Sequence, residues 1–148
     1  MVSSTMEQYL LEPDSVFQWI WATQVPSNIK AFVWRAMLGR LQTRDNLLRR
    51  QILRDVDDAK CAFCRLEVET CSHLLFTCSE SMAIWYECFA WLGVSIAQVA
   101  DPRIHLLQFP VIGISKSQKL AETAIWMATV WSIWCVRNRV IFSGGGAR

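Results

Sequence analysis

The feature that most constrains how this chain can fold is a short segment rich in cysteine. Four of the six cysteines fall between residues 61 and 78 together with His73, in the pattern C-x2-C-x8-H-x4-C. Structural zinc takes four tetrahedral ligands from thiolates and imidazoles, and a two-residue gap lets one tight turn place two thiolates on the same ion. The pattern therefore predicts a zinc site with these ligands: Cys61, Cys64, His73 and Cys78.

Other interpretations of the same segment stay open. Cys71 can replace His73 or Cys78 as a ligand, although we favour His73 because Cys71 lies two residues away and would need a different turn. The cysteines can also be ordinary buried residues beside a core histidine. A redox pair of Cys61 and Cys64 is disfavoured because no βαβ pattern surrounds them. We expect Cys88 and Cys135 to be packing residues.

A site with four protein ligands predicts a structural zinc ion. Such a site leaves no position for a reacting water, which a catalytic zinc needs. Structural zinc contributes an apparent binding free energy of about 10–16 kcal/mol, comparable with the net stability of a whole domain. We therefore expect Zn2+ to hold the fold together and the chain to have no catalysis of its own.

The hydrophobic pattern predicts a mainly α fold. Apolar residues from Ile29 to Met37 recur at the spacing of one helical face, with Pro26 in the first turn and Gly39 at the end. Thr43 is the expected N-cap of a helix from Arg44 to about Leu53. Further helices are expected up to Gly93 and over residues 117–142. We predict a small helical domain organised around a CCHC zinc knuckle, with a Trp-rich C-terminal helix.

The length of 148 residues and the 53% of hydrophobic residues fit one domain with a sizeable core. The start of the chain has no signal-peptide pattern, so we expect an intracellular protein of the nucleus or cytoplasm. The apolar run from Thr123 to Val136 is too short for a membrane span. We expect a flexible leader over 1–16, the zinc-binding helical domain over 17–93, an irregular connection with room for a small element over 94–116, the C-terminal helix over 117–142 and a flexible tail over 143–148.

Basic side chains are concentrated in the segment between residues 30 and 54, where Asp45 is the single acidic residue. Arginine matches phosphate geometry, and neutralising phosphates releases counterions, so this segment predicts a nucleic-acid-binding face. Trp34 follows Lys30 by one helical turn and can either stack on a base or pack. The other interpretation is an ordinary solvated helix face. The candidate residues are Lys30, Arg35, Arg40, Arg44, Arg49, Arg50 and Arg54.

Eight tryptophans are a large number for a chain of this length. We expect most of them to build the core, because aromatic side chains bury much area per residue. A surplus of exposed aromatic residues would instead mark a surface that docks on a larger protein. The tryptophans expected in the core are Trp19, Trp21, Trp34, Trp85, Trp126, Trp131 and Trp134.

These motifs together resemble the zinc-binding region at the C-terminal end of plant LINE-type (non-LTR) retrotransposon reverse transcriptases. The resemblance is close over residues 17–92 and looser over 120–142. The matching motifs are Phe17-Gln-Trp-Ile-Trp21, Val25-Pro-Ser-Asn-Ile-Lys-Ala-Phe-Val-Trp-Arg35, Gly39-Arg-Leu-Gln-Thr43, Asn46-Leu-Leu-Arg-Arg50, Cys61-x2-Cys64, Glu69-Thr-Cys-Ser-His-Leu-Leu-Phe-Thr-Cys78, Ile84-Trp85, Trp131-x2-Trp134-x2-Arg137-Asn138 and Phe142.

The resemblance implies the same four zinc ligands, with Cys71 as a departure from the family pattern. In that family the region follows a polymerase domain, but this chain has no aromatic-x-Asp-Asp polymerase motif and no nuclease-like carboxylate spacing. Two functions follow as hypotheses. One is a non-catalytic module that binds RNA or DNA through the basic face, and the other is a module that docks on a polymerase domain or another protein through its Trp-rich helix. Neither involves a membrane or a small-molecule substrate.

Overall fold

The computed structural model describes residues 13–95, 97–108 and 115–144. This part of the chain is built from helices, and its single piece of β-type pairing is an isolated antiparallel bridge between Lys60 and Val68. The expected mainly α fold is confirmed. The helices are α2 (Pro13–Ala22), α3 (Ser27–Met37), α4 (Arg44–Arg49), the 3-10 helix η1 (Val56–Ala59), the π-helix η2 (His73–Thr77), α5 (Ser79–Leu92), α6 (Pro102–Gln108) and α7 (Lys116–Gly144).

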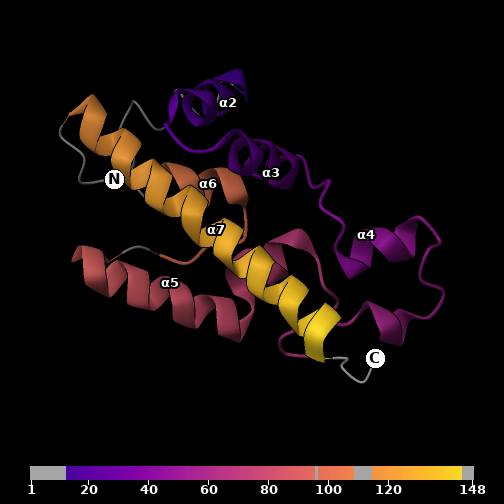
Figure 1. The fold of residues 1–148 in the computed structure, drawn as a ribbon. Coiled ribbons are helices and arrows are strands. Elements are labelled where there is room, and N and C mark those ends of the chain that lie inside the picture. The colour runs from indigo at the N-terminus through magenta and orange to yellow at the C-terminus, as the bar shows by residue number, and fades with distance from the viewer. Residues whose placement is uncertain (1–12, 96, 109–114, 145–148) are drawn as a thin grey trace.

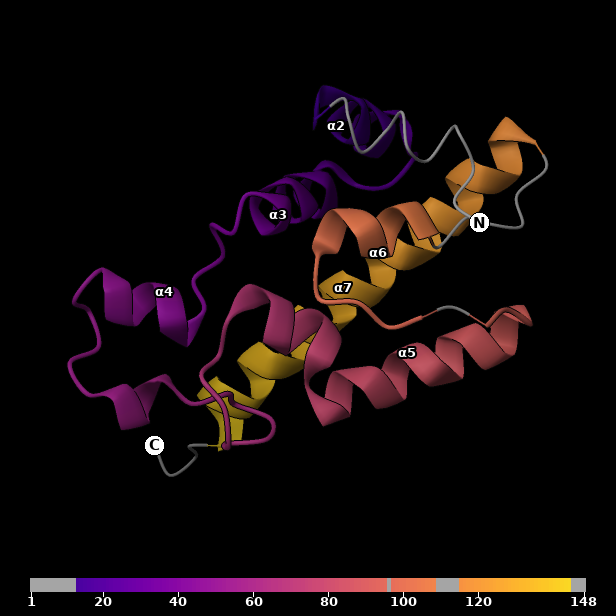
Figure 2. The same cartoon turned by 180° about the vertical axis from the view of Figure 1, so that it is seen from behind.

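The longest helix, α7, organises the arrangement of the others. It has 29 residues and is therefore about 43 Å long. Helices α2 and α3 pack along it, and its other contacts include η2 (Figure 1). Seen from behind, α4 and the cysteine-rich segment lie near the C-terminal end of α7 (Figure 2). The helix thus connects the hydrophobic core with the cysteine-rich segment. None of the described helices is long and apolar enough to cross a membrane.

The core is an aromatic cluster contributed by four elements. The rings of Phe76 and Trp85 stack with centroids 6.1 Å apart, and Trp126 lies 6.2 Å from Trp85. The indole of Trp85 donates a hydrogen bond of 2.7 Å to the carbonyl of Leu75. These contacts join η2, α5 and α7, and α6 adds His105 between the rings. The cysteine-rich segment is therefore anchored directly on the core through η2.

The beginning of the described chain corrects the predicted leader. Residues 13–16 form the first turn of α2 instead of belonging to a flexible segment, and residues 1–12 lie outside the described part. Pro13 is the first residue of α2, where its missing N–H costs nothing, so it is compatible with the start of the helix. Val16 and Ile20 are buried, and Trp19 donates a 2.8 Å hydrogen bond to Thr123 of α7.

The predicted boundaries of α3 and α4 are largely confirmed. Gly39 has a φ of +67°, a left-handed conformation that terminates α3. Thr43 caps α4 by accepting a hydrogen bond from the backbone N–H of Asn46 at 3.3 Å. However, α4 ends at Arg49 rather than near Leu53, because Gln51 adopts a left-handed φ of 61°. Ile52 therefore lies beyond the end of the helix and is 57% exposed.

The later helices are found where they were expected, with one added helix and with small shifts at the ends of the last one. The expected helix up to Gly93 is α5, and Gly93 follows it with a φ of +72°. The predicted irregular connection over 94–116 contains α6, the small element for which it had room, and Lys116 already belongs to α7. Residues 143 and 144 continue α7, so they are not part of a flexible tail, and residues 145–148 lie outside the described part.

The tryptophans divide into buried and exposed groups. Trp85 and Trp126 are buried, and Trp131 and Trp134 are partly buried against Phe32, with ring centroids 5.2 and 5.8 Å away. Trp34, expected in the core, is 41% exposed. It lies on α3 away from the buried face formed by Phe32, Val33, Ala36 and Met37. Trp21 is likewise exposed, and Trp19 is partly buried.

We predict that His105 makes stability depend on pH. Its Nδ1 accepts a 2.8 Å hydrogen bond from the indole of Trp126, and Gln98 Oε1 lies 3.3 Å from its Nε2. Burial lowers the pKa of His105 from 6.5 to about 4. The unfolded chain therefore binds a proton more readily than the fold does, so stability is complete above pH 6.5 and falls as the pH approaches 4. The loss is about 3 kcal/mol.

The free energy of unfolding in urea should be measured at neutral and at mildly acidic pH for the unchanged protein and for His105→Gln. Glutamine keeps a hydrogen-bond acceptor but does not titrate. The variant should be less stable at neutral pH and should lose less stability on acidification. Metal release at low pH affects both proteins, so the difference between their pH slopes reports His105. Equal slopes would show that His105 does not couple protonation to folding.

Candidate metal centre and adjoining basic groove

The first two cysteines lie in a loop that its own backbone closes. The N–H of Cys61 donates to the carbonyl of Glu67 at 2.7 Å, and the N–H of Arg65 donates to the carbonyl of Cys61 at 2.9 Å. Inside the loop, backbone N–H groups donate to both sulfurs, from Phe63 to Cys61 at 3.4 Å and from Leu66 to Cys64 at 3.5 Å. Donors aimed at sulfur favour the thiolate form that binds metal.

The other two donors are connected by the π-helix η2. The backbone N–H of Cys78 donates to the carbonyl of His73 at 2.7 Å, an i to i+5 hydrogen bond that closes one wide turn. This turn accounts for the x4 spacing, because it brings residues five positions apart to the same side of the helix. Leu74, Leu75 and Phe76 in between are buried in the core.

The four predicted ligands come together in space. One donor atom from each of Cys61, Cys64, His73 and Cys78 lies within 4.8 Å of all the others. The sulfurs of Cys61 and Cys78 are 3.9 Å apart, and the sulfur of Cys64 is 3.3 Å from Nε2 of His73. A tetrahedral zinc ion requires about 3.8 Å between two sulfurs and about 3.5 Å between sulfur and nitrogen. The donor set therefore fits zinc.

A carboxylate lies beside the histidine of this cluster. Oε2 of Glu67 lies 3.2 Å from Nδ1 of His73, on the opposite side of the ring from Cys64. A carboxylate at this position favours the tautomer with the proton on Nδ1, which leaves Nε2 free to bind a metal. The nearby carboxylate thus favours the form of the imidazole that a metal ligand requires.

The two cysteines of the loop differ in acidity. Burial raises the pKa of the Cys61 thiol to about 12. Burial also opposes ionisation of Cys64, but hydrogen bonds from the backbone of Leu66 and Glu67 and from His73 outweigh it and lower the pKa of that thiol to about 6. Metal binding requires both thiolates, so loading of the site releases protons.

Cys71, the alternative ligand considered above, lies outside this cluster. Its sulfur is 3.6 Å from the carbonyl oxygen of Ala36 in α3, and burial raises the pKa of its thiol to about 12. Cys88 and Cys135 are partly buried, and Cys88 packs against the core, as expected of packing residues.

A buried ion pair next to the cluster was not predicted from the sequence. The carboxylate of Glu69 is fully buried and lies 2.6 Å from the guanidinium of Arg137 in α7. It also accepts hydrogen bonds from the backbone N–H of Arg44, at 3.1 Å, and of Ala62, at 3.0 Å. Glu69 thereby connects the start of α4, the Cys61–Cys64 loop and α7. Its one sequence signal is that both partners lie in the motifs on which the resemblance to reverse transcriptases is based.

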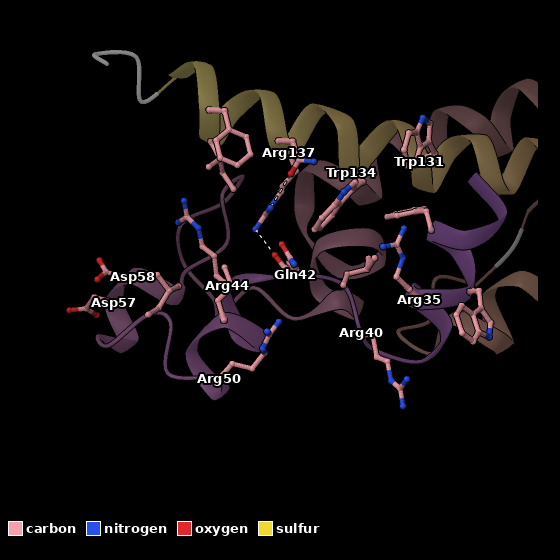
Figure 3. Close-up of a pocket in the computed structure, with 18 residues that line it drawn as sticks. Arg35, Arg40, Gln42, Arg44, Arg50, Asp57, Asp58, Trp131, Trp134 and Arg137 are labelled. Carbon is pink, nitrogen blue, oxygen red and sulfur yellow. Dashed lines mark hydrogen bonds between the residues drawn. The ribbon is translucent and has the colours of Figure 1, made fainter. Parts of the chain in front are cut away.

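The predicted basic residues do not all share one environment. Five are exposed, whereas Lys30 donates to the carbonyl of Trp21 at 2.9 Å and Arg44 donates to the carbonyl of Lys60 at 2.9 Å. Arg49 pairs with Asp45 at 3.3 Å. Four of the seven line one open groove beside α7, and Arg49, Arg54 and Lys30 do not (Figure 3). The four are Arg35, Arg40, Arg44 and Arg50.

The groove combines these arginines with aromatic residues. Its volume is about 1130 Å³, and α3, α4 and the C-terminal half of α7 form its walls. Trp131 and Trp134 of α7 line it, with the Arg137 guanidinium 4.7 Å above the Trp134 ring. Asp57 and Asp58 lie at the end of the groove opposite to Arg35 (Figure 3). We call this feature the basic groove.

The fold and the cluster define a mainly α protein with a Cys3His centre suited to a metal ion. Residues 3–85 match the family model described as zinc-binding in reverse transcriptase, and the chain belongs to this family. The matched region contains all four donors and describes a zinc-binding segment rather than a polymerase domain. Helices α6 and α7, and with them one wall of the basic groove, lie beyond it. Comparisons with curated proteins and with solved structures give no match.

Proposed function

We propose that this protein is a non-catalytic, zinc-stabilised module that binds nucleic acid through the basic face of α3 and α4. The observation that carries the proposal is a groove lined by arginines. Glu69 links Arg44 of this groove to Ala62, in the loop that holds two of the four metal-type donors. Arginine side chains without neighbouring carboxylates bind phosphate readily. The proposed contacts are the seven basic residues between Lys30 and Arg54.

The proposed role of the metal is structural. Cys61, Cys64, His73 and Cys78 would hold Zn2+, and four protein ligands close its coordination sphere. The bound ion supplies a cross-link between the Cys61–Cys64 loop and η2. These residues supply no open position for a substrate, which supports a role without catalysis.

We also propose a more specific origin, in a plant LINE-type retrotransposon. The support for it is the set of motifs from Phe17 to Phe142 that resembles the reverse transcriptases of those elements. A protein that binds the RNA or DNA of such a retrotransposon would act in the nucleus or cytoplasm.

Nucleic-acid binding is tested by titrating the zinc-loaded protein against labelled RNA and DNA at several salt concentrations. The logarithm of the binding constant should fall linearly with the logarithm of salt, with a slope of about −0.9 per phosphate neutralised on a duplex and about −0.7 on a single strand. Arg40→Glu should weaken binding at low salt, while Arg139→Glu, at an exposed position of α7 outside the groove, serves as the control. Absent or salt-independent binding would refute the proposal.

A second candidate function is docking on a reverse transcriptase polymerase domain. We predicted the Trp-rich helix as its surface, but α7 buries Trp126 and partly buries Trp131 and Trp134. Exposed aromatic residues on α5 favour that helix instead, with Trp91 76% exposed and Tyr86 also exposed. Co-sedimentation with such a domain that Trp91→Ala abolishes would favour docking over nucleic-acid binding.

A further inference from the structure

We propose that the basic groove is a site for single-stranded nucleic acid, in which arginines hold phosphates and aromatic rings stack on bases. The inference rests on the proposed nucleic-acid function, and it specifies where the ligand lies and which form of nucleic acid is preferred. It is based on two kinds of side chain that line the basic groove: arginines without a carboxylate partner, and exposed aromatic rings.

The arginines of the groove are available to an anion. Within the part of the chain that the structure describes, Arg35, Arg40 and Arg50 have no carboxylate at ion-pair distance, whereas Arg49 outside the groove is paired with Asp45 at 3.3 Å. Arg137 also lines the groove, but Glu69 neutralises it. The positive charge that a ligand meets therefore comes from α3, α4 and the segment between them.

The aromatic residues distinguish a single strand from a duplex. Trp34 on α3 is 41% exposed and Phe142 on α7 is 65% exposed, so the groove has an open ring on each of two walls. In a duplex the bases stack on one another, so their faces are not accessible to protein aromatic rings and the phosphates are the main contacts. An unpaired strand offers both phosphates and base faces, and every base can stack on an aromatic ring without sequence specificity. The lining thus suits an unpaired strand.

Charge also indicates how the strand lies. Arg35 is at one end of the groove, Asp57 and Asp58 are at the other, and Arg44 and Arg50 lie between them (Figure 3). Carboxylates repel phosphate, so we infer that the strand runs past Arg35 and Arg40 and leaves the groove before the aspartates. Trp134 is covered by Arg137 at 4.7 Å and by Phe32, and it forms the floor rather than a stacking platform.

Fluorescence anisotropy with labelled oligouridylate, oligothymidylate and a hairpin duplex tests the inference. Single strands should bind more tightly than the hairpin at equal salt. Trp34→Ala should weaken single-strand binding by about 5- to 150-fold, the value of one lost stacking contact, without changing the salt slope. Arg40→Ala should instead reduce the magnitude of the slope by about 0.7, the contribution of one phosphate on a single strand.

Matched controls separate the groove from the rest of the surface. Trp91→Ala removes an exposed tryptophan on α5, and Arg139→Ala removes an exposed arginine of α7 that lies outside the groove and outside the seven proposed contacts, so both should bind as the unchanged protein does. Trp34→Phe should restore most of the affinity lost in Trp34→Ala, because phenylalanine also stacks. Since Trp34 and Arg40 are exposed, thermal melting should confirm that every variant is folded.

The outcomes distinguish the two proposals. If the hairpin binds as tightly as the single strands, or if Arg54→Ala, at a proposed contact outside the groove, weakens binding while Trp34→Ala and Arg40→Ala do not, the groove is not the site, although the nucleic-acid function stands. If no nucleic acid binds at low salt, both proposals fail.

Discussion

Cys61→Ser is expected to leave the chain largely unfolded and free of zinc. The variant removes one of the four donors, whose atoms lie within 4.8 Å of one another, at a position where the side chain is fully buried. Structural zinc contributes about 10–16 kcal/mol of apparent binding free energy, and a domain of this size has a net stability of about 5–15 kcal/mol. Loss of the ion therefore removes an amount comparable with all the stability that the fold has.

Far-ultraviolet circular dichroism and metal analysis of the purified variant measure this result. Treatment of the unchanged protein with a chelator should reproduce it, and His73→Ala should behave in the same way. Cys71→Ser is the matched control, because Cys71 lies in the same segment but outside the cluster and serine keeps a donor near the carbonyl of Ala36. A zinc-free His73→Ala protein with an unchanged melting temperature would contradict the structural role of the metal.

Glu69→Ala is expected to lower the free energy of unfolding by about 3–5 kcal/mol. The substitution leaves the guanidinium of Arg137 buried without its carboxylate, which lies 2.6 Å away in the unchanged protein. The backbone N–H groups of Arg44 and Ala62 also lose their acceptor. Urea unfolding monitored by circular dichroism, with zinc present throughout, gives the difference directly.

A double-mutant cycle with Arg137→Ala isolates the ion pair. The double variant should be more stable than the sum of the single effects predicts, by about 0.5–3 kcal/mol, because removing both partners leaves no isolated buried charge. Arg49→Ala is the contrasting control, since the Arg49 side chain is 75% exposed and its pair with Asp45 is worth at most about 1 kcal/mol. Strictly additive effects of Glu69→Ala and Arg137→Ala would show that the two side chains do not act as a pair.

The metal cluster was predictable because its four ligands lie close together in the sequence. The spacing of Cys61, Cys64, His73 and Cys78 is set by a tight loop and a single helical turn, so residues close in sequence become donors close in space. The N-cap of α4 at Thr43 and the end of α5 at Gly93 were predictable for the same reason, because each depends on a few neighbouring backbone groups.

Features that depend on distant residues were not predictable. Glu69 and Arg137 are 68 positions apart, and no periodicity relates them. The basic groove likewise needs α7 beside α3 and α4, so the pattern of basic residues alone did not separate Arg40, which lines it, from Arg54, which does not. The predicted leader over 1–16 extended too far, because the effect of Pro13 depends on whether the following residues form a helix, and the burial of Val16 and Ile20 favours one.

The length of α7 has a consequence for shortened copies of this chain. A copy that stopped after α5 would still contain every sulfur and nitrogen donor of the cluster, yet it would lack the cation that compensates Glu69 and the wall that carries Phe142. Binding of the metal ion and binding of an unpaired strand would then be separate properties. Retained metal in a truncated relative is therefore no sign that the nucleic-acid site has survived.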